Sequence, residues 1–350
     1  MSITCRKYGE ISGKTIMAFT LCNDNGLEVE ILNYGGIITK LIYKGIDVVL
    51  GWDNLDEYIN NVGSYGALIG RNANRIENAE FDLKGKHYKL VQNSGNHNIH
   101  SGPDGFSKRI WKAEIINEKE PSIKLILDSP DGDQGFPGNL HIEVTYSLDK
   151  DNSLRIRYEG LSDQDTIVNM TNHSYFNPNG HESGSIENCK LWIASDFYLP
   201  CAENKIPTGE ILIVDNTPFD FKEIKTIREN LLRDSEQLQL SGSYDHTFVI
   251  NGSGFRKSAL CVGDKTGVYI EMHTDCPGVQ VFIPPMVFPG KAKNGAIYCE
   301  KNAICLESQA FPNSINTPSF PTVVVKAEEK YQTETVYKFG IFDCAKEELI

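Results

Sequence analysis

The 350-residue sequence has no apolar run that approaches the length of a membrane span, and its first seven residues lack the apolar core of a signal peptide. It also has no Cys-x-x-Cys pair, because its nine cysteines are scattered along the chain. Secreted proteins commonly use an even number of cysteines in a disulfide framework, which this pattern does not match. We therefore expect a reduced, cytoplasmic protein with no membrane partner.

An excess of basic residues is absent too. The 34 Lys and Arg residues are outnumbered by 47 Asp and Glu residues, which gives a formal net charge of −13. A nucleic-acid partner needs a basic surface that neutralises phosphates, so we expect none. The sequence also has no Walker loop, no Gly-x-Gly-x-x-Gly, no Gly-x-Ser-x-Gly and no His-Glu-x-x-His. No cofactor is therefore expected.

What the sequence does contain is a long series of short strand-like segments. Apolar and β-branched residues recur in runs separated by Gly, Asn or Asp, among them Leu27–Leu32, Ile46–Leu50, Leu140–Leu148, Thr166–Thr171, Val268–His273 and Ala303–Glu307. Helical spacing is confined to Ile224–Arg233 and to one or two turns at Leu55–Asn60. No linker or repeat divides the chain. We predict an all-β protein: one large β-sandwich domain over residues 1–350 with few short helices, as a monomer or a homodimer.

One polar cluster stands at the middle of the chain. A strand-like run ends there in Asn172, His173, Ser174 and Tyr175. Such a cluster offers several donors and acceptors, together with an aromatic face, to a ligand rich in hydroxyls. The residues alone also fit a hydrogen-bonded strand end in which His173 is a satisfied core histidine.

Two earlier segments carry polar side chains that strand patterning does not require. Arg71 and Arg75, with Asn74, follow a glycine-rich approach and can donate hydrogen bonds to a sugar, although a polar loop with a structural ion pair is the alternative. His97 and His100 have a spacing that metal ligands can use, but the sequence assigns no third ligand. No metal site is therefore predicted.

Two acidic residues are associated with later strands. Asp245 opens a strand-like run, where its carboxylate can accept from two hydroxyls or simply form a turn. Glu307 follows an apolar strand, and alternation places it on the same side as Cys305. A carboxylate that points inward is unfavourable unless it is partnered or functional. Glu307 beside a histidine would form a base-and-acid pair, and Glu307 beside an arginine would be structural.

Taken together and in this order, these motifs resemble the aldose 1-epimerase family, the galactose mutarotases. The resemblance covers nearly the whole chain and rests on Gly70–Ile76 (Gly-Arg-x-x-Asn-Arg-Ile), Asn98-Ile99-His100, Asn172–Asn177 (Asn-His-Ser-Tyr-Phe-Asn), Tyr244-Asp245-His246, Pro277–Gln280 (Pro-Gly-Val-Gln) and Leu306–Gln309 (Leu-Glu-Ser-Gln). It implies a large β-sandwich that needs no cofactor. It also implies an isomerase that interconverts the α and β anomers of a free hexose such as galactose or glucose.

The resemblance further implies roles for individual residues. Glu307 would be the general base and His173 the general acid, and the sugar would be bound or oriented by Asn74, Arg75, His100, Tyr175, Asp245 and Gln280. With Glu307 ionised and His173 protonated, the rate would have a bell-shaped pH dependence. Its low-pH limb would report the carboxylate and its high-pH limb the imidazolium.

The sequence departs from the family pattern at Ser101, at Pro178 and at Phe282–Met286. The third departure follows Gln280, so we expect it to affect the preference between hexoses. The sequence leaves four alternative functions: a non-catalytic sugar-binding protein, an epimerase of a phosphorylated hexose, a metal enzyme using His97 and His100, and a glycosidase using Asp245 and Glu307. A phosphorylated substrate would require further Arg or Lys side chains at the site, which the acidic balance does not favour.

Overall fold

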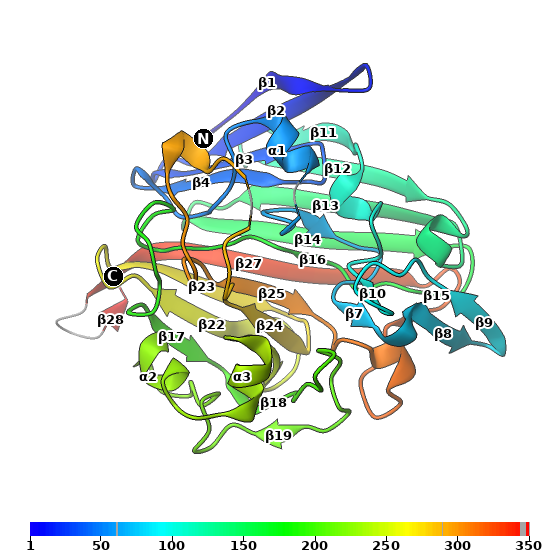
Figure 1. Cartoon of the computed structure of the whole chain (residues 1–350). Helices are drawn as coiled ribbons and strands as arrows, with labels where there is room; N and C mark the ends of the chain where they lie inside the picture. The colour runs from blue at the N-terminus through cyan, green and yellow to red at the C-terminus, as the bar shows by residue number, and fades with distance from the viewer. Residues whose placement is uncertain (61, 289, 344–347, 350) are drawn as a thin grey trace.

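The computed structural model describes residues 1–60, 62–288, 290–343 and 348–349. It is an all-β sandwich, as predicted, in which strands greatly outnumber helices (Figure 1). The α-helices in these ranges have five or six residues, too few to cross a membrane: α1 (Leu55–Ile59), α2 (Ile227–Leu231) and α3 (Glu236–Ser241). Short 3₁₀ turns occupy Glu77–Ala79, Phe106–Lys108, Asp133–Gly135, Lys293–Gly295 and Ser314–Asn316.

The largest sheet has ten antiparallel strands and runs through the centre of the molecule (Figure 1). In spatial order they are β11 (Lys112–Asn117), β12 (Ser122–Ser129), β13 (Leu140–Leu148), β14 (Ser153–Ser162), β27 (Lys330–Asp343), β23 (Val268–Thr274), β22 (Arg256–Val262), β17 (Lys190–Ile193) and β20 (Lys225–Thr226), with β28 (Glu348–Leu349) paired to β27. In β13, residues at every second position from Leu140 to Leu148 are buried, while those between them are partly or fully exposed. One face of the sheet is therefore buried and the other is partly exposed, because successive side chains of a strand point to opposite faces.

Two five-stranded sheets pack on this one. The first consists of β1 (Ser2–Ile11), β2 (Lys14–Cys22), β3 (Leu27–Leu32), β4 (Ile38–Tyr43) and β5 (Ile46–Asp47). The second, in spatial order, consists of β19 (Leu212–Ile213), β18 (Ser195–Tyr198), β21 (Asp245–Ile250), β24 (Gly278–Phe282) and β25 (Cys305–Gln309). One cluster of buried side chains joins all three sheets, with members that include Ile31, Val144, Phe248 and Leu306.

Four pairs of short strands lie at one end of the sandwich and carry several of the polar motifs. They are β6 (Leu68–Ile69) with β16 (Thr171–Asn172), β7 (Arg75–Ile76) with β10 (Asn98–Ile99), β15 (Thr166–Ile167) with β26 (Val324–Val325), and β8 (Glu80–Leu83) with β9 (Lys86–Lys89). Figure 1 shows β7 and β10 beside the edge of the second five-stranded sheet. The motifs are therefore brought together at one place although they are far apart in the sequence.

The structure corrects several predicted boundaries. The expected strand Thr166–Thr171 is split into β15 and β16, because Asn169 forms only an isolated parallel bridge with Asn72 and Met170 N donates to the hydroxyl of Tyr331 instead of to a ladder partner. The expected strand Ile46–Leu50 is regular only over Ile46–Asp47. The expected helix Ile224–Arg233 begins at Ile227, since Lys225–Thr226 pairs with β17.

Several elements were missed altogether, among them the strands β1 and β18 and the helix α3. Strand β1 is an edge strand whose residues are all exposed or only half-buried, so it has no apolar alternation to reveal it. Helix α3 is only six residues long, and only two of its residues, Leu238 and Ser241, are buried. The helix expected at Leu55–Asn60 is confirmed as α1, where the Asn54 side chain caps the amide of Glu57.

Candidate active site

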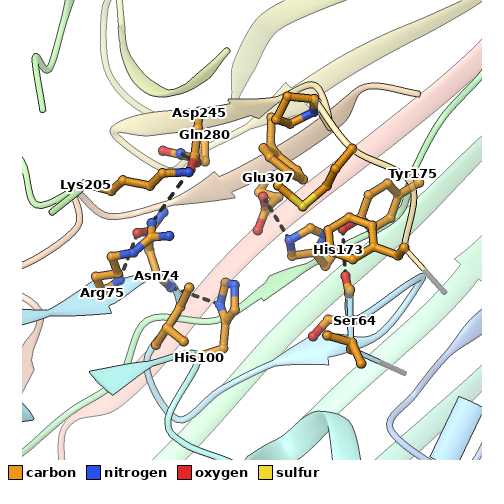
Figure 2. Close-up of a pocket in the computed structure, with 17 residues that line it drawn as sticks. Ser64, Asn74, Arg75, His100, His173, Tyr175, Lys205, Asp245, Gln280 and Glu307 are labelled. Carbon is orange, nitrogen blue, oxygen red and sulfur yellow. Dashed lines mark hydrogen bonds and ion pairs between the residues drawn. The ribbon is translucent and has the colours of Figure 1, made fainter. Parts of the chain in front are cut away.

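A cavity of about 280 Å³ opens where the second five-stranded sheet meets the short strand pairs. Its wall contains every residue that the sequence assigned to the site: Asn74, Arg75, His100, His173, Tyr175, Asp245, Gln280 and Glu307. Figure 2 shows these residues arranged around a common space. Lys205 and Ser64 also line this space and were not among the predicted site residues.

The sheet register explains how three of these side chains meet. Glu307 of β25 pairs directly with Gln280 of β24, so both side chains point to the same face of the sheet. Gln280 in turn pairs with Thr247 of β21, two residues beyond Asp245. The Gln280 amide reaches diagonally to Asp245, with Nε2 donating to Oδ1 at 2.7 Å, while Thr247 Oγ1 donates to Gln280 Oε1 at 2.5 Å. The amide orientation is thereby fixed.

His173 and Glu307 form a close pair at the buried end of the cavity. Nε2 of His173 lies 3.6 Å from Oε1 of Glu307, and the two residues are only 6% and 2% exposed. Burial lowers the pKa of His173 to about 4. Burial also raises the pKa of Glu307 well above its usual value, with Asp245 adding to the rise and Arg75 opposing it. Burial therefore favours a neutral imidazole and a protonated carboxyl, not the ion pair expected from the sequence.

His173 is held in place from two sides. Its backbone bonds to the segment just before β6, with His173 N donating to the Ala67 carbonyl and Gly66 N donating to the His173 carbonyl, both at 2.9 Å. The Tyr175 ring stacks on the imidazole with centroids 5.0 Å apart, and the Tyr175 hydroxyl donates to the Gly63 carbonyl at 2.7 Å. Tyr175 thus orients the histidine, and its hydroxyl already has an acceptor in the protein.

Asp245 lies at the other end of the cavity among positive charges. Arg75 Nη1 is 3.9 Å and Lys205 Nζ is 3.4 Å from the same oxygen, Oδ2. Burial alone would raise the pKa of Asp245, but Arg75, Lys205 and the hydrogen bond from Gln280 bring it below its usual value. Asp245 is therefore an ionised acceptor, suited to sugar hydroxyls.

His100 is fixed as a hydrogen-bond donor to the cavity. Its Nδ1 accepts from the backbone N–H of Asn74 at 3.2 Å, so the proton of the neutral ring is assigned to Nε2. Burial, His173 and Arg75 lower the pKa of His100 well below its usual value, which keeps the ring neutral. The Asn74 side chain accepts from Arg75 N at 2.8 Å and shapes the same turn.

The structure separates residues that the sequence could not. Arg71 lies outside the cavity wall, is fully buried and bonds to backbone carbonyls, whereas Arg75 faces the cavity. His97 accepts from the backbone amide of Asn78 at 3.0 Å and does not line the cavity. Within the described ranges, no group of three or more His, Cys, Asp or Glu side chains is placed to hold a metal ion.

An apolar part of the wall completes the cavity. It is formed by the segment after Gln280, where the sequence departs from the family pattern, and includes Phe282, Pro285, Met286 and Phe288. The Phe282 ring lies edge-on to His173, with centroids 6.2 Å apart. The other two departures from the family pattern, Ser101 and Pro178, do not line the cavity. The Ser101 hydroxyl accepts from the backbone N–H of Asn72 at 2.7 Å, and the Pro178 carbonyl accepts from the Thr266 hydroxyl.

Comparisons with known proteins agree with this geometry. The model of the family described as aldose 1-epimerase matches residues 17–338. The chain is 36% identical to a galactose mutarotase from Bos taurus, covering 97% of this chain and 99% of that protein, and 35% identical to an aldose 1-epimerase from Haemophilus influenzae, covering 93% and 96%. A crystal structure of a galactose 1-epimerase from Lactobacillus acidophilus superposes with a TM-score of 0.87 at 28% identity, covering 97% of this chain and 98% of that one. The protein described here belongs to the aldose 1-epimerase family.

Proposed function

We propose that this protein is an aldose 1-epimerase that interconverts the α and β anomers of a free hexose such as galactose or glucose. The observation that carries the proposal is the buried His173–Glu307 pair, 3.6 Å apart, facing a set of hydroxyl-binding groups. A polarimetric assay with fresh α-galactose or α-glucose tests it directly. Addition of the protein should speed the approach to the anomeric equilibrium far beyond the rate in buffer.

The reaction requires one base and one acid at the same sugar carbon. Glu307 removes the proton from the hydroxyl on C1 while His173 delivers a proton to the ring oxygen O5. The C1–O5 bond breaks, its electron pair goes to O5, and C1 becomes an aldehyde. Half a turn about the C1–C2 bond presents the other face of the aldehyde. O5 then attacks C1, and the two residues reverse their roles and recover their initial protonation.

The pair needs one shared proton, and the 3.6 Å separation allows either residue to hold it. With the proton on His173, Glu307 is the base for ring opening. Burial favours the proton on Glu307 in the free enzyme. This form fits ring closure, in which Glu307 gives its proton to the C1 oxygen and the neutral His173 takes one from the hydroxyl on C5. Because closing is the reverse of opening, both forms belong to one catalytic cycle.

Neighbouring groups are suited to the charge that moves during ring opening. The Nε2–H of His100 and the guanidinium of Arg75 can donate to sugar oxygens on which negative charge develops. Asp245, held by Gln280, can accept from hydroxyls and so fixes the ring orientation. These interactions form inside a buried, fixed framework, which makes them stronger than in water.

The pH dependence of kcat/KM should be bell-shaped, with limbs opposite to those expected from the sequence. Activity should fall on the acid side when His173 is protonated while Glu307 also holds a proton, so that the pair carries two. Burial lowers the pKa of His173 to about 4. Activity should fall on the alkaline side as Glu307 loses its proton, at a pKa raised well above 4.5. The pair is surrounded by His100, Arg75, Asp245 and Tyr175. The two limbs therefore report apparent pKa values of the coupled pair and not of either residue alone.

Anomer exchange measured by NMR from acid to alkaline pH, with the buffer rate subtracted, provides the profile. Full activity should persist well below the usual histidine pKa of about 6.5. A rate that rises through that value, as an exposed histidine would give, would contradict the assignment of the limbs.

Arg75→Ala should slow catalysis and leave the fold intact. Arg75 faces the cavity, and its ionic partner Asp245 lies 3.9 Å away, so its loss removes a contact to the sugar more than a structural bond. We expect kcat/KM to fall by about 1–3 kcal/mol of transition-state binding. Arg228→Ala, on the exposed face of α2, is the matched control. Equal kinetics for the two variants would assign Arg75 to structure alone.

A further inference from the structure

Lys205 stands at the tip of a short hairpin, residues 201–207, in the connection between β18 and β19. Two backbone hydrogen bonds close the turn: Lys205 N donates to the Ala202 carbonyl at 2.8 Å, and Ala202 N donates to the Ile206 carbonyl at 2.9 Å. The Lys205 side chain is 33% exposed, and its Nζ donates to Asp245 Oδ2 at 3.4 Å (Figure 2). The hairpin therefore brings a cation to the cavity wall, beside the carboxylate of Asp245.

The base of this hairpin is held by the side chain of Gln237, a residue of α3. Cys201 N donates to Gln237 Oε1 at 2.7 Å, and Gln237 Nε2 donates to the Cys201 carbonyl at 3.0 Å. The amide thus pairs with both backbone groups of Cys201, as a residue on a neighbouring antiparallel strand would. Cys201 also forms the bridge with Pro207 that joins the two arms of the hairpin. The arms and the helix are therefore fixed to each other at one residue.

His246 sets the orientation of the Gln237 amide and links it to Asp245. His246 Nδ1 accepts from the backbone N–H of Asp245 at 3.2 Å, so the proton of the neutral ring is assigned to Nε2, which lies 3.2 Å from Gln237 Oε1. Oε1 is then the acceptor of the amide and Nε2 its donor. The His246 ring is buried and packs edge-on against Phe219, with centroids 4.8 Å apart. Burial lowers the pKa of His246 to about 4, which keeps the ring neutral.

These interactions form a closed circuit around the Lys205–Asp245 contact. Asp245 is the neighbour of His246 on β21, and His246 holds Gln237. Gln237 holds Cys201, from which the hairpin carries Lys205 back to Asp245. Gln237 itself is half-buried and does not line the cavity. A partly exposed ammonium 3.4 Å from a carboxylate gains little from that contact alone, so its position depends on how firmly its backbone is held.

We infer that Gln237 is a positioning residue of the sugar site, which holds the hairpin so that Lys205 stays against Asp245. This inference rests on the proposed function and adds to it a residue outside the cavity wall. Without the amide, the tip of the hairpin is free to shift and the ammonium leaves Asp245, which loses one of the donors that keep it ionised and aligned. The loss should appear in KM, because the residues that transfer protons are unchanged.

Polarimetric kinetics at neutral pH test the inference, with galactose or glucose, whichever the wild type epimerises faster. Gln237→Leu should raise KM by a factor of about 3–10, the loss of one partly exposed hydrogen bond to a charged group, and should change kcat little. Lys205→Met should raise KM by at least the same factor. Gln237→Leu should then have no further effect in the Lys205→Met background, because Gln237 acts through Lys205. A purely structural residue would give effects that add.

Gln239→Leu is the matched control. Gln239 belongs to the same helix, and its amide donates to Asp234 instead of to the hairpin, so KM should stay as it is. Gln237→Glu is a second, nearly isosteric variant for the case in which leucine prevents folding. It keeps an acceptor for Cys201 N but places an oxygen against the Cys201 carbonyl, so it should raise KM as well. Circular dichroism and Tm check that each variant is folded.

The inference is overturned if the Gln237 variants have the wild-type KM, or if Gln237→Leu raises KM by the same factor with and without the Lys205 ammonium. It is overturned too if Gln239→Leu matches Gln237→Leu, or if neither Gln237 variant folds, which would make the residue a structural one. A wild-type protein that speeds the anomer exchange of neither galactose nor glucose would overturn the proposed function instead.

Discussion

Glu307→Gln should reduce the enzyme-catalysed rate of anomer exchange by a factor of about 100 or more. The amide keeps the shape of the side chain but can neither take the proton of the C1 hydroxyl nor exchange one with His173, 3.6 Å away. Sugar binding should persist, because Arg75, His100, Asp245 and Gln280 remain. Single-turnover polarimetry and a separate binding measurement distinguish the two effects. Activity near that of the wild type, with binding unchanged, would overturn the mechanism.

The same substitution should make the folded protein more stable at alkaline pH. In the folded state burial raises the pKa of Glu307, so the unfolded state releases its proton first as the pH rises. This group therefore contributes full stability below its unfolded pKa and loses that contribution as pH rises through the folded pKa. Glutamine does not titrate, so the variant should have a higher Tm than the wild type at pH 8 and a similar Tm at pH 4.

Thermal unfolding at the two pH values checks this result. Glu118→Gln changes the same chemical group at an exposed position and should leave both Tm and activity close to those of the wild type. A Glu307→Gln variant that is less stable at both pH values would show that the carboxyl group is a structural partner. A gain in stability with a loss of activity is the pattern expected of a catalytic carboxyl kept in an apolar site.

The sequence predicted residues that line one cavity because each lies in a motif whose residues stand out from the strand pattern. Asp245, Gln280 and Glu307 are on neighbouring strands of one sheet, so their motifs had to converge once the strands paired. Lys205 could not be found in this way. It lies in a loop without a recognisable motif, and only the turn at Ala202–Ile206 carries it to Asp245.

Burial was the second property that the sequence did not supply. The sequence predicts an ionised Glu307 and a protonated His173. The structure leaves the two groups so little exposed that burial reverses the order of their pKa values and hence the assignment of the two pH limbs. The break in the strand at Thr166–Thr171 has a similar origin, because Met170 N bonds to the hydroxyl of Tyr331, 161 residues away in the sequence.

Arg71→Met should lower the free energy of unfolding by about 3–5 kcal/mol. Arg71 is only 1% exposed, and its guanidinium donates to the carbonyls of Pro137, Gly138 and Ser129 at 2.7–3.1 Å and to the hydroxyl of Ser129 at 2.6 Å. Burial lowers its pKa only to about 10, so it remains charged at neutral pH. Methionine fills similar space but donates to none of these buried acceptors.

Urea unfolding of Arg71→Met and Arg75→Ala separates two arginines that the sequence presents as equals. Arg71→Met should lower the midpoint strongly and leave the folded enzyme with nearly normal kinetics, because Arg71 does not line the cavity. Arg75→Ala should leave the midpoint close to that of the wild type and should slow catalysis. Arg71→Lys retains the charge but not the fork that reaches several carbonyls, so its stability should fall between the wild type and Arg71→Met. If Arg71→Met unfolded at the wild-type midpoint, the buried network around the guanidinium would not stabilise the fold, and the division of labour between the two arginines would be wrong.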